Sequence, residues 1–162
     1  MIGAMDYAPL ITAAATSHAL PTDLVRAVAD VESGLDPLAV RFEPAVFARL
    51  PLVRPVAPCS EETERWARAA SWGLLQVMGV TARGLGFTGP YLSALCDPAM
   101  GLEYGCRLLG RLAELYKARF DWPGVVAAYN AGAPRLAQDN KTFVNQDYVD
   151  KIKTALAGPW PV

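Results

Sequence analysis

Apolar residues recur at intervals of three and four along most of the chain, the spacing that places side chains on one face of an α-helix. This pattern predicts a first helix over about residues 7–18 and a second over about 22–33. Gly34 follows the second helix directly and is the expected stop signal. Alternating patterns typical of strands are almost absent, so the chain is predicted to be all-α.

The middle of the chain departs from this regularity. Residues 36–60 contain five prolines and predict an irregular, partly extended excursion with one short helix near 45–50. Residues 60–71 are predicted to be helical, with Ser60 as N-cap and acidic residues in the first turn. The glycine-bounded stretch 72–86 is interpreted as a further short helical segment.

The longest helix is expected to begin at Asp97-Pro98, with Asp97 as cap and Pro98 in the first turn. Its predicted inner stripe consists of Gly105, Leu108, Leu109, Leu112, Leu115 and Tyr116.

Two more helices complete the predicted pattern. One begins at Asp121-Trp122-Pro123 and is broken by the sequence Asn-Ala-Gly-Ala-Pro. The last is capped by Asp147, buries Val149, Ile152 and Leu156, and ends at Gly158-Pro159. The 162 residues therefore predict one all-α domain spanning 1–162.

Composition narrows the function. The chain is 52% hydrophobic and 19% charged with a net charge of −1, which indicates a globular protein and argues against nucleic-acid binding. The cysteines, Cys59, Cys96 and Cys106, are interpreted as small buried hydrophobes, with one disulfide plus one free thiol as the alternative. Their spacing fits no zinc site, and His18, the single histidine, suits the end of the first helix. We therefore expect neither a metal nor a cofactor.

Export and membrane signals are not recognisable in the sequence. The N-terminal residues lack a basic region followed by a long apolar run, and no stretch of about 18 apolar residues is present. We expect a monomer without a membrane span.

Glu32 occupies an unusual position in the second helix. It follows Val28 by four residues, Val25 by seven and Leu24 by eight, so it continues the apolar stripe into the last turn. Apolar surroundings favour the neutral form of a carboxyl group and raise its pKa, as a general acid requires. The alternative is a frayed helix end whose carboxylate reaches water.

Four sequence blocks, in order, resemble the soluble lytic transglycosylases, lysozyme-like enzymes that cut bacterial peptidoglycan. The blocks are "ESGLDPLAV" (32–40), "SWGLLQVM" (71–78), "AAYNAG" (127–132) and "NQDYVDKI" (145–152). This resemblance covers most of the chain and implies a lysozyme-like helical fold similar to that of goose-type lysozyme.

The resemblance also implies a mechanism with one carboxyl group. In this family the glutamate matched by Glu32 protonates the glycosidic oxygen between N-acetylmuramic acid and N-acetylglucosamine. It then takes the proton of the muramoyl C6 hydroxyl, which attacks C1 and leaves a 1,6-anhydro end. Most glycosidases instead use two carboxyl groups.

Substrate-binding residues follow from the matched blocks. Gln76 is expected to hydrogen-bond an N-acetyl group or to hold a loop, Met78 to line the sugar pocket or the core, and Ser71 to contact substrate or cap a segment. Tyr129 is expected beside the acid, with Asn130 binding sugar or fixing a turn. Tyr148 resembles the tyrosine that lines the far side of the groove.

A second acid is harder to assign. Asp36, before Pro37, is interpreted as a turn residue. Glu43 lies in an excursion longer than the usual family pattern and is a candidate for the cleft, for an ion pair with Arg41, or for the surface. Val144 stands where some relatives carry an acid, so any role of that acid is in doubt here.

Three functions remain open at this level. The first is a peptidoglycan lytic transglycosylase, the second a hydrolytic muramidase on the same fold, and the third a non-catalytic wall-binding domain of a phage tail or secretion apparatus. Without an export signal, the expected setting is a phage endolysin, a virion-associated enzyme or a protein carried by a secretion apparatus.

Overall fold

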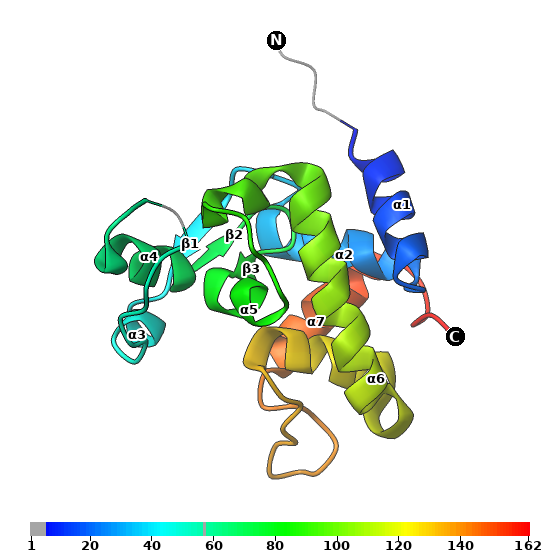
Figure 1. Cartoon of the computed structure of the whole chain (residues 1–162). Helices are drawn as coiled ribbons and strands as arrows, with labels where there is room; N and C mark the ends of the chain where they lie inside the picture. Colours follow the sequence, from blue (N-terminus) through cyan, green and yellow to red (C-terminus); the bar gives the residue numbers. More distant parts are fainter. Residues whose placement is uncertain (1–5, 57) are drawn as a thin grey trace. The chain divides into compact units, whose positions relative to one another are not determined.

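The computed structural model describes residues 6–56 and 58–162, and most of them are helical (Figure 1). The helices are α1 (Ala8–Ser17), α2 (Thr22–Ser33), α3 (Pro44–Phe47), α4 (Glu61–Arg68), α5 (Gly79–Gly84), the 3-10 helix η1 (Leu92–Cys96), α6 (Pro98–Ala131) and α7 (Gln146–Leu156). The strands are β1 (Val40–Phe42), β2 (Ala70–Trp72) and β3 (Val77–Met78). The predicted helical class is therefore confirmed. No helix among these residues is long and apolar enough to cross a membrane.

The chain forms two compact units. The first unit comprises the chain up to Val31 together with Cys106–Val162, and the second comprises Glu32–Gly105. Both chain crossings between the units fall inside helices, within α2 and within α6. The predicted single domain stays a prediction.

Helix α2 confirms the predicted boundaries and the predicted stripe. It runs from Thr22 to Ser33, and Gly34 follows with φ +62°, a left-handed conformation that glycine adopts without steric cost. Leu24, Val25 and Val28 are fully buried. The period of 3.6 in the sequence thus identified the buried face of this helix.

Helix α6 agrees with the sequence at its start and differs along its stripe. Asp97 caps it through a hydrogen bond from Met100 N, as expected. Leu109 and Leu112 are buried, but Leu115 is 60% exposed and Leu102, which the prediction left out, is fully buried. The spacing of apolar residues indicates which face is inside but not how far neighbouring elements extend along it.

The predicted helix start at residues 121–123 corresponds to a break inside α6. Asp121 has φ 52° and ψ −165°, which is not helical, and Pro123 follows it. Proline lacks the N–H that would continue the ladder and clashes with the preceding turn, so the helix must restart here.

A β-hairpin replaces the first part of the short helical segment predicted over 72–86, whereas Gly79–Gly84 form helix α5 as predicted. Strands β1, β2 and β3 form an antiparallel sheet in that order. Helix α4 lies between β1 and β2 in the chain and ends at Arg68, two residues before β2 begins. Gly73 (φ +71°) and Gln76 (φ +47°) hold left-handed conformations in the turn between β2 and β3, which a continuous helix excludes. The short apolar run was ambiguous between helix and strand, and tertiary pairing selected the strand.

The excursion over 36–60 contains one strand and one short helix. The short helix is α3, somewhat earlier than the predicted 45–50, and β1 precedes it. Arg65 of α4 donates two hydrogen bonds to the Phe47 carbonyl, at 3.1 and 2.8 Å. The predicted N-cap of α4 is confirmed, because Ser60 Oγ accepts a hydrogen bond from Thr63 N at 3.1 Å.

Helix α7 starts two positions earlier than predicted. Asn145 is the N-cap residue and Asp147 lies inside the first turn, so the predicted capping role of Asp147 is wrong. A carboxylate in the first turn still interacts favourably with the helix dipole, which explains why the sequence signal resembled a cap. Val149 and Ile152 are buried as expected, whereas Leu156 is half-buried.

The cysteines differ in burial, and His18 lies at the end of α1. Cys59, Cys96 and Cys106 form no disulfide bond, so the alternative of one disulfide is wrong; Cys106 is buried, whereas Cys59 and Cys96 are half-buried. The interpretation as a buried hydrophobe thus holds for Cys106 alone. His18 is the C-cap residue of α1, as expected.

Candidate functional site

Glu32 lies in the last turn of α2, one residue before the helix ends. It is half-buried, whereas Asp30 on the other side of the same turn is exposed. The apolar stripe therefore places Glu32 in a partly dehydrated position. Its role in proton transfer stays a prediction.

Ser33 connects this turn to the hairpin of the second unit. Its hydroxyl donates a 2.8 Å hydrogen bond to the carbonyl oxygen of Leu74, 41 residues further along the chain. Leu74 lies in the turn between β2 and β3 and is fully buried. The residue next to Glu32 is thereby fixed to the hairpin.

Gln76 holds the same turn from the other side. Its side-chain Nε2 donates to the carbonyl oxygens of Ala39 at 2.9 Å and Gly73 at 3.0 Å. The Gly73 N–H also donates to the Ala39 carbonyl, at 2.9 Å. Of the two roles expected for Gln76, holding a loop is therefore observed, and the hydrogen bond to an N-acetyl group stays a prediction.

Ser71 and Met78 are direct partners across the sheet. Ser71 pairs with Met78 of β3 and with Arg41 of β1, so these three side chains lie in one row on one face. Ser71 is only 3% exposed, and Met78 is half-buried. Ser71 lies within a strand, so its alternative role as a helix cap is wrong.

Glu43 forms an ion pair with Arg41. Their Oε1 and Nε atoms are 2.7 Å apart, and the side chains are 32% and 68% exposed. This confirms one of the three expected roles for Glu43. An ion pair this exposed contributes little to stability, and a role of Glu43 in substrate binding stays a prediction.

The remaining predicted site residues belong to the first unit. Tyr129 and Asn130 lie at the end of α6, and Tyr148 lies in the first turn of α7. Asn145 Nδ2 donates to Asn130 Oδ1 at 2.9 Å and to the Ala127 carbonyl at 3.0 Å. The N-cap residue of α7 thus holds the end of α6, and it fixes the orientation of the Asn130 amide.

Asn145 is an organising residue to which sequence reasoning assigned no role. A polar residue one position before a helix is the local signal for it, but its partners lie 15 and 18 residues away.

The predicted site residues are divided between the two units. The second unit contains Glu32, Glu43, Ser71, Gln76 and Met78, and the first contains Tyr129, Asn130 and Tyr148. In each unit, a hydrogen bond holds part of the predicted site in place: Ser33 to Leu74 in the second unit and Asn145 to Asn130 in the first.

Comparison with known proteins places the chain in a family. The transglycosylase SLT domain family matches residues 9–151. The crystal structure of an endolysin from Burkholderia phage AP3 is similar, with a TM-score of 0.56 and 23% sequence identity over 93% of this chain and 68% of that chain. At this identity the likeness concerns the fold alone, and together with the family match it supports the expected lysozyme-like fold. No curated protein matches significantly. The chain belongs to the transglycosylase SLT domain family, and this membership supports a transglycosylase- or lysozyme-like activity on peptidoglycan.

Proposed function

We propose that this protein is a peptidoglycan lytic transglycosylase. It cleaves the β-1,4 bond between N-acetylmuramic acid and N-acetylglucosamine and leaves 1,6-anhydro-muramoyl ends. The observation that carries this proposal is the match to the SLT domain over residues 9–151, which includes Glu32 at the end of α2.

The proposed reaction uses Glu32 as acid and then as base. The protonated carboxyl group gives its proton to the glycosidic oxygen as the bond between that oxygen and C1 breaks. The muramoyl O6 then bonds to C1, and its proton returns to Glu32. The carboxyl group is regenerated, no water is consumed, and no second carboxylate takes part.

The residues of the two units have supporting roles in this proposal. Gln76 Oε1 accepts from an N-acetyl N–H group, and Met78 and Ser71 border the sugar. In the first unit, Tyr129, Asn130 and Tyr148 contact the glycan. The hydrogen bond from Ser33 to Leu74 supports this arrangement, since it holds the turn that carries Glu32.

The test is product analysis of purified peptidoglycan by mass spectrometry. The wild-type protein is expected to release anhydro-muramoyl products. Glu32→Gln keeps the shape of the side chain but cannot donate a proton in this way, so activity should fall by about 10³-fold. Glu114→Gln, at an exposed position of α6, is the matched control and should retain activity.

Three other outcomes are informative. Reducing muramoyl ends in place of anhydro ends would indicate a hydrolytic muramidase, and loss of those ends in Glu43→Gln would assign the water-positioning acid. A wild-type protein that binds peptidoglycan and leaves it uncut would contradict both enzymatic functions. Full activity of Glu32→Gln would remove Glu32 from the chemistry.

The likeness to a phage endolysin supports a setting in phage-induced lysis. We propose that the protein acts on the bacterial cell wall during phage release or entry.

A further inference from the structure

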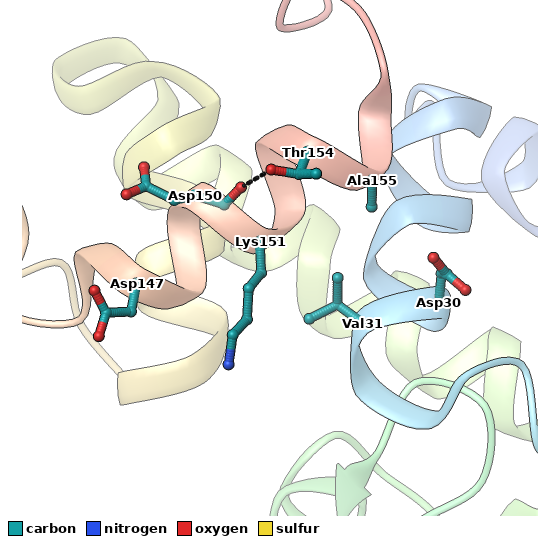
Figure 2. Close-up of a pocket in the computed structure, with 7 residues that line it drawn as sticks. All are labelled: Asp30, Val31, Asp147, Asp150, Lys151, Thr154 and Ala155. Atoms are coloured by element: carbon teal, nitrogen blue, oxygen red, sulfur yellow. Dashed lines mark hydrogen bonds between the residues drawn. The ribbon is translucent and has the colours of Figure 1, made fainter.

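A pocket of about 530 Å³ lies within the first unit, and its lining residues include none of the proposed site residues. Asp30 and Val31, from the end of α2, form one side, and Asp147, Asp150, Lys151 and Thr154 of α7 form the other (Figure 2). Its volume is in the range of pockets that bind small ligands.

The α7 side of this pocket is set by helical spacing. Asp147, Lys151 and Thr154 are separated by four and three residues, so they share one face of the helix. Figure 2 shows Asp147 and Lys151 extending from the same side of α7, with Val31 across from Lys151. Asp150 is engaged elsewhere, because its Oδ1 accepts from Gln146 at 2.9 Å and its carbonyl accepts from Thr154 Oγ1.

Charges of both signs border the pocket without neutralising each other. Asp30, Asp147 and Lys151 are exposed. Among the residues that the structure describes, no ion pair involves any of these three. A ligand with one anionic and one cationic group would satisfy both, whereas a simple cation or anion would satisfy only one.

We propose that this pocket binds the peptide stem of peptidoglycan. Lys151 pairs with a carboxylate of the stem, and Asp147 pairs with an ammonium group of its diamino acid. This inference rests on the proposed function for its substrate class. Val31, which lines the pocket, directly precedes the proposed acid Glu32 in α2.

The direct test is a binding titration with a free stem tripeptide, alanyl-γ-glutamyl-diaminopimelate, followed by NMR. The full-length wild-type protein is the host, because the free tripeptide contains no glycosidic bond that the proposed reaction could cut. We expect the amide signals of residues 147–154 to shift. Lys151→Met and Asp147→Asn should each weaken binding about tenfold, the usual size for loss of a charge-assisted contact.

One control changes the protein and another changes the tripeptide, and together they identify the proposed ion pair of Lys151 with a stem carboxylate. Lys141→Met, at an exposed position in the same unit, should bind as the host does. A tripeptide with amidated carboxyl groups should bind the host as weakly as it binds Lys151→Met, because the same ion pair is lost in both cases. Circular dichroism would verify that each variant is folded.

Failure of this inference is distinguishable from failure of the proposed function. Equal binding by the host, Lys151→Met and Lys141→Met, or no binding at all, would overturn the pocket assignment even if the wild type cuts glycan. Binding that depends on Lys151, in a protein that never cuts glycan, would support the pocket and overturn the proposed reaction.

Discussion

Ser33 illustrates how one side chain fixes the position of its neighbour. Its hydroxyl donates a 2.8 Å hydrogen bond to the backbone carbonyl oxygen of Leu74, a fully buried residue. Glu32 is one residue away, so any displacement of Ser33 moves the proposed acid. The role we assign to Ser33 is positioning, since it acts through Glu32.

Ser33→Ala tests this role. We expect the free energy of unfolding to fall by about 1–2 kcal/mol, because the Leu74 carbonyl loses its donor. In the peptidoglycan assay kcat should fall while KM changes little, since the substrate contacts remain. Urea denaturation and initial rates are the measurements, and Ser17→Ala, whose hydroxyl makes only an exposed bond within α1, is the control. An unchanged kcat would show that Ser33 does not position the acid.

Cys96 has a pKa above the ordinary value for a cysteine, chiefly because burial penalises the thiolate. A backbone hydrogen bond at Gly73 partly offsets this effect, and the Asp36 carboxylate adds to it. The folded-state pKa is raised, so the stability contributed by this thiol is present at neutral pH. It is lost as the pH rises through that pKa.

Alkylation with iodoacetamide, followed by peptide mass spectrometry, measures this shift. Cys96 should react more slowly at pH 7.5 than a free cysteine, and its rate should continue to rise beyond the ordinary thiol range. Asp36→Asn removes the repelling charge, so the reaction of Cys96 at pH 7.5 should become faster. A wild-type rate equal to that of free cysteine would contradict the assignment.

At the scale of elements, the turn between β2 and β3 depends on Gly73. Its φ is +71°, and a Cβ atom at this position would overlap the carbonyl oxygen of Leu95 in η1. Gly84, the last residue of α5, has open space around its missing side chain and no positive φ. A methyl group would therefore clash with Leu95 at Gly73 but would meet no neighbouring atom at Gly84.

Gly73→Ala should therefore lower the free energy of unfolding by about 3 kcal/mol, through strained backbone and a steric clash. Gly84→Ala should leave it unchanged or raise it by up to about 1 kcal/mol, because the unfolded chain loses freedom. Chemical denaturation of both variants is the measurement. Equal effects of the two substitutions would show that the turn tolerates a side chain.

Helices and strands were predictable to different degrees. The limits of α2 and the caps at Ser60 and Asp97 follow from residues within one or two turns, so the sequence identified them. Strand β2 pairs with β1, and the paired residues Arg41 and Ser71 are 30 positions apart in the chain. No local pattern encodes that partner. The predicted cap at Asp147 failed by two residues because Asn145 satisfies distant groups instead of its own helix.

At the scale of the whole molecule, the chain has two compact units joined through two helices. The crossings lie between Val31 and Glu32 in α2 and between Gly105 and Cys106 in α6. A helix propagates cooperatively, so unfolding of one unit should disrupt the end of the other.

We therefore expect one cooperative unfolding transition, as a single domain requires. Differential scanning calorimetry should give one peak whose calorimetric and van't Hoff enthalpies agree. A purified fragment of residues 32–105 should not fold by itself, because the cut removes most of both helices. Two separated transitions would contradict the single-domain prediction.

The sequence by itself determined the helical class, the family resemblance and the placement of Glu32 at the end of a buried stripe. These depend on local periodicity, on a glycine stop at Gly34 and on short motifs, all encoded within a few residues. Only the tertiary structure decided the hairpin, the Ser33–Leu74 and Asn145–Asn130 hydrogen bonds, and the pocket beside Lys151. Each of these joins residues separated by many positions in the chain, so its free energy depends on a partner that local sequence does not specify.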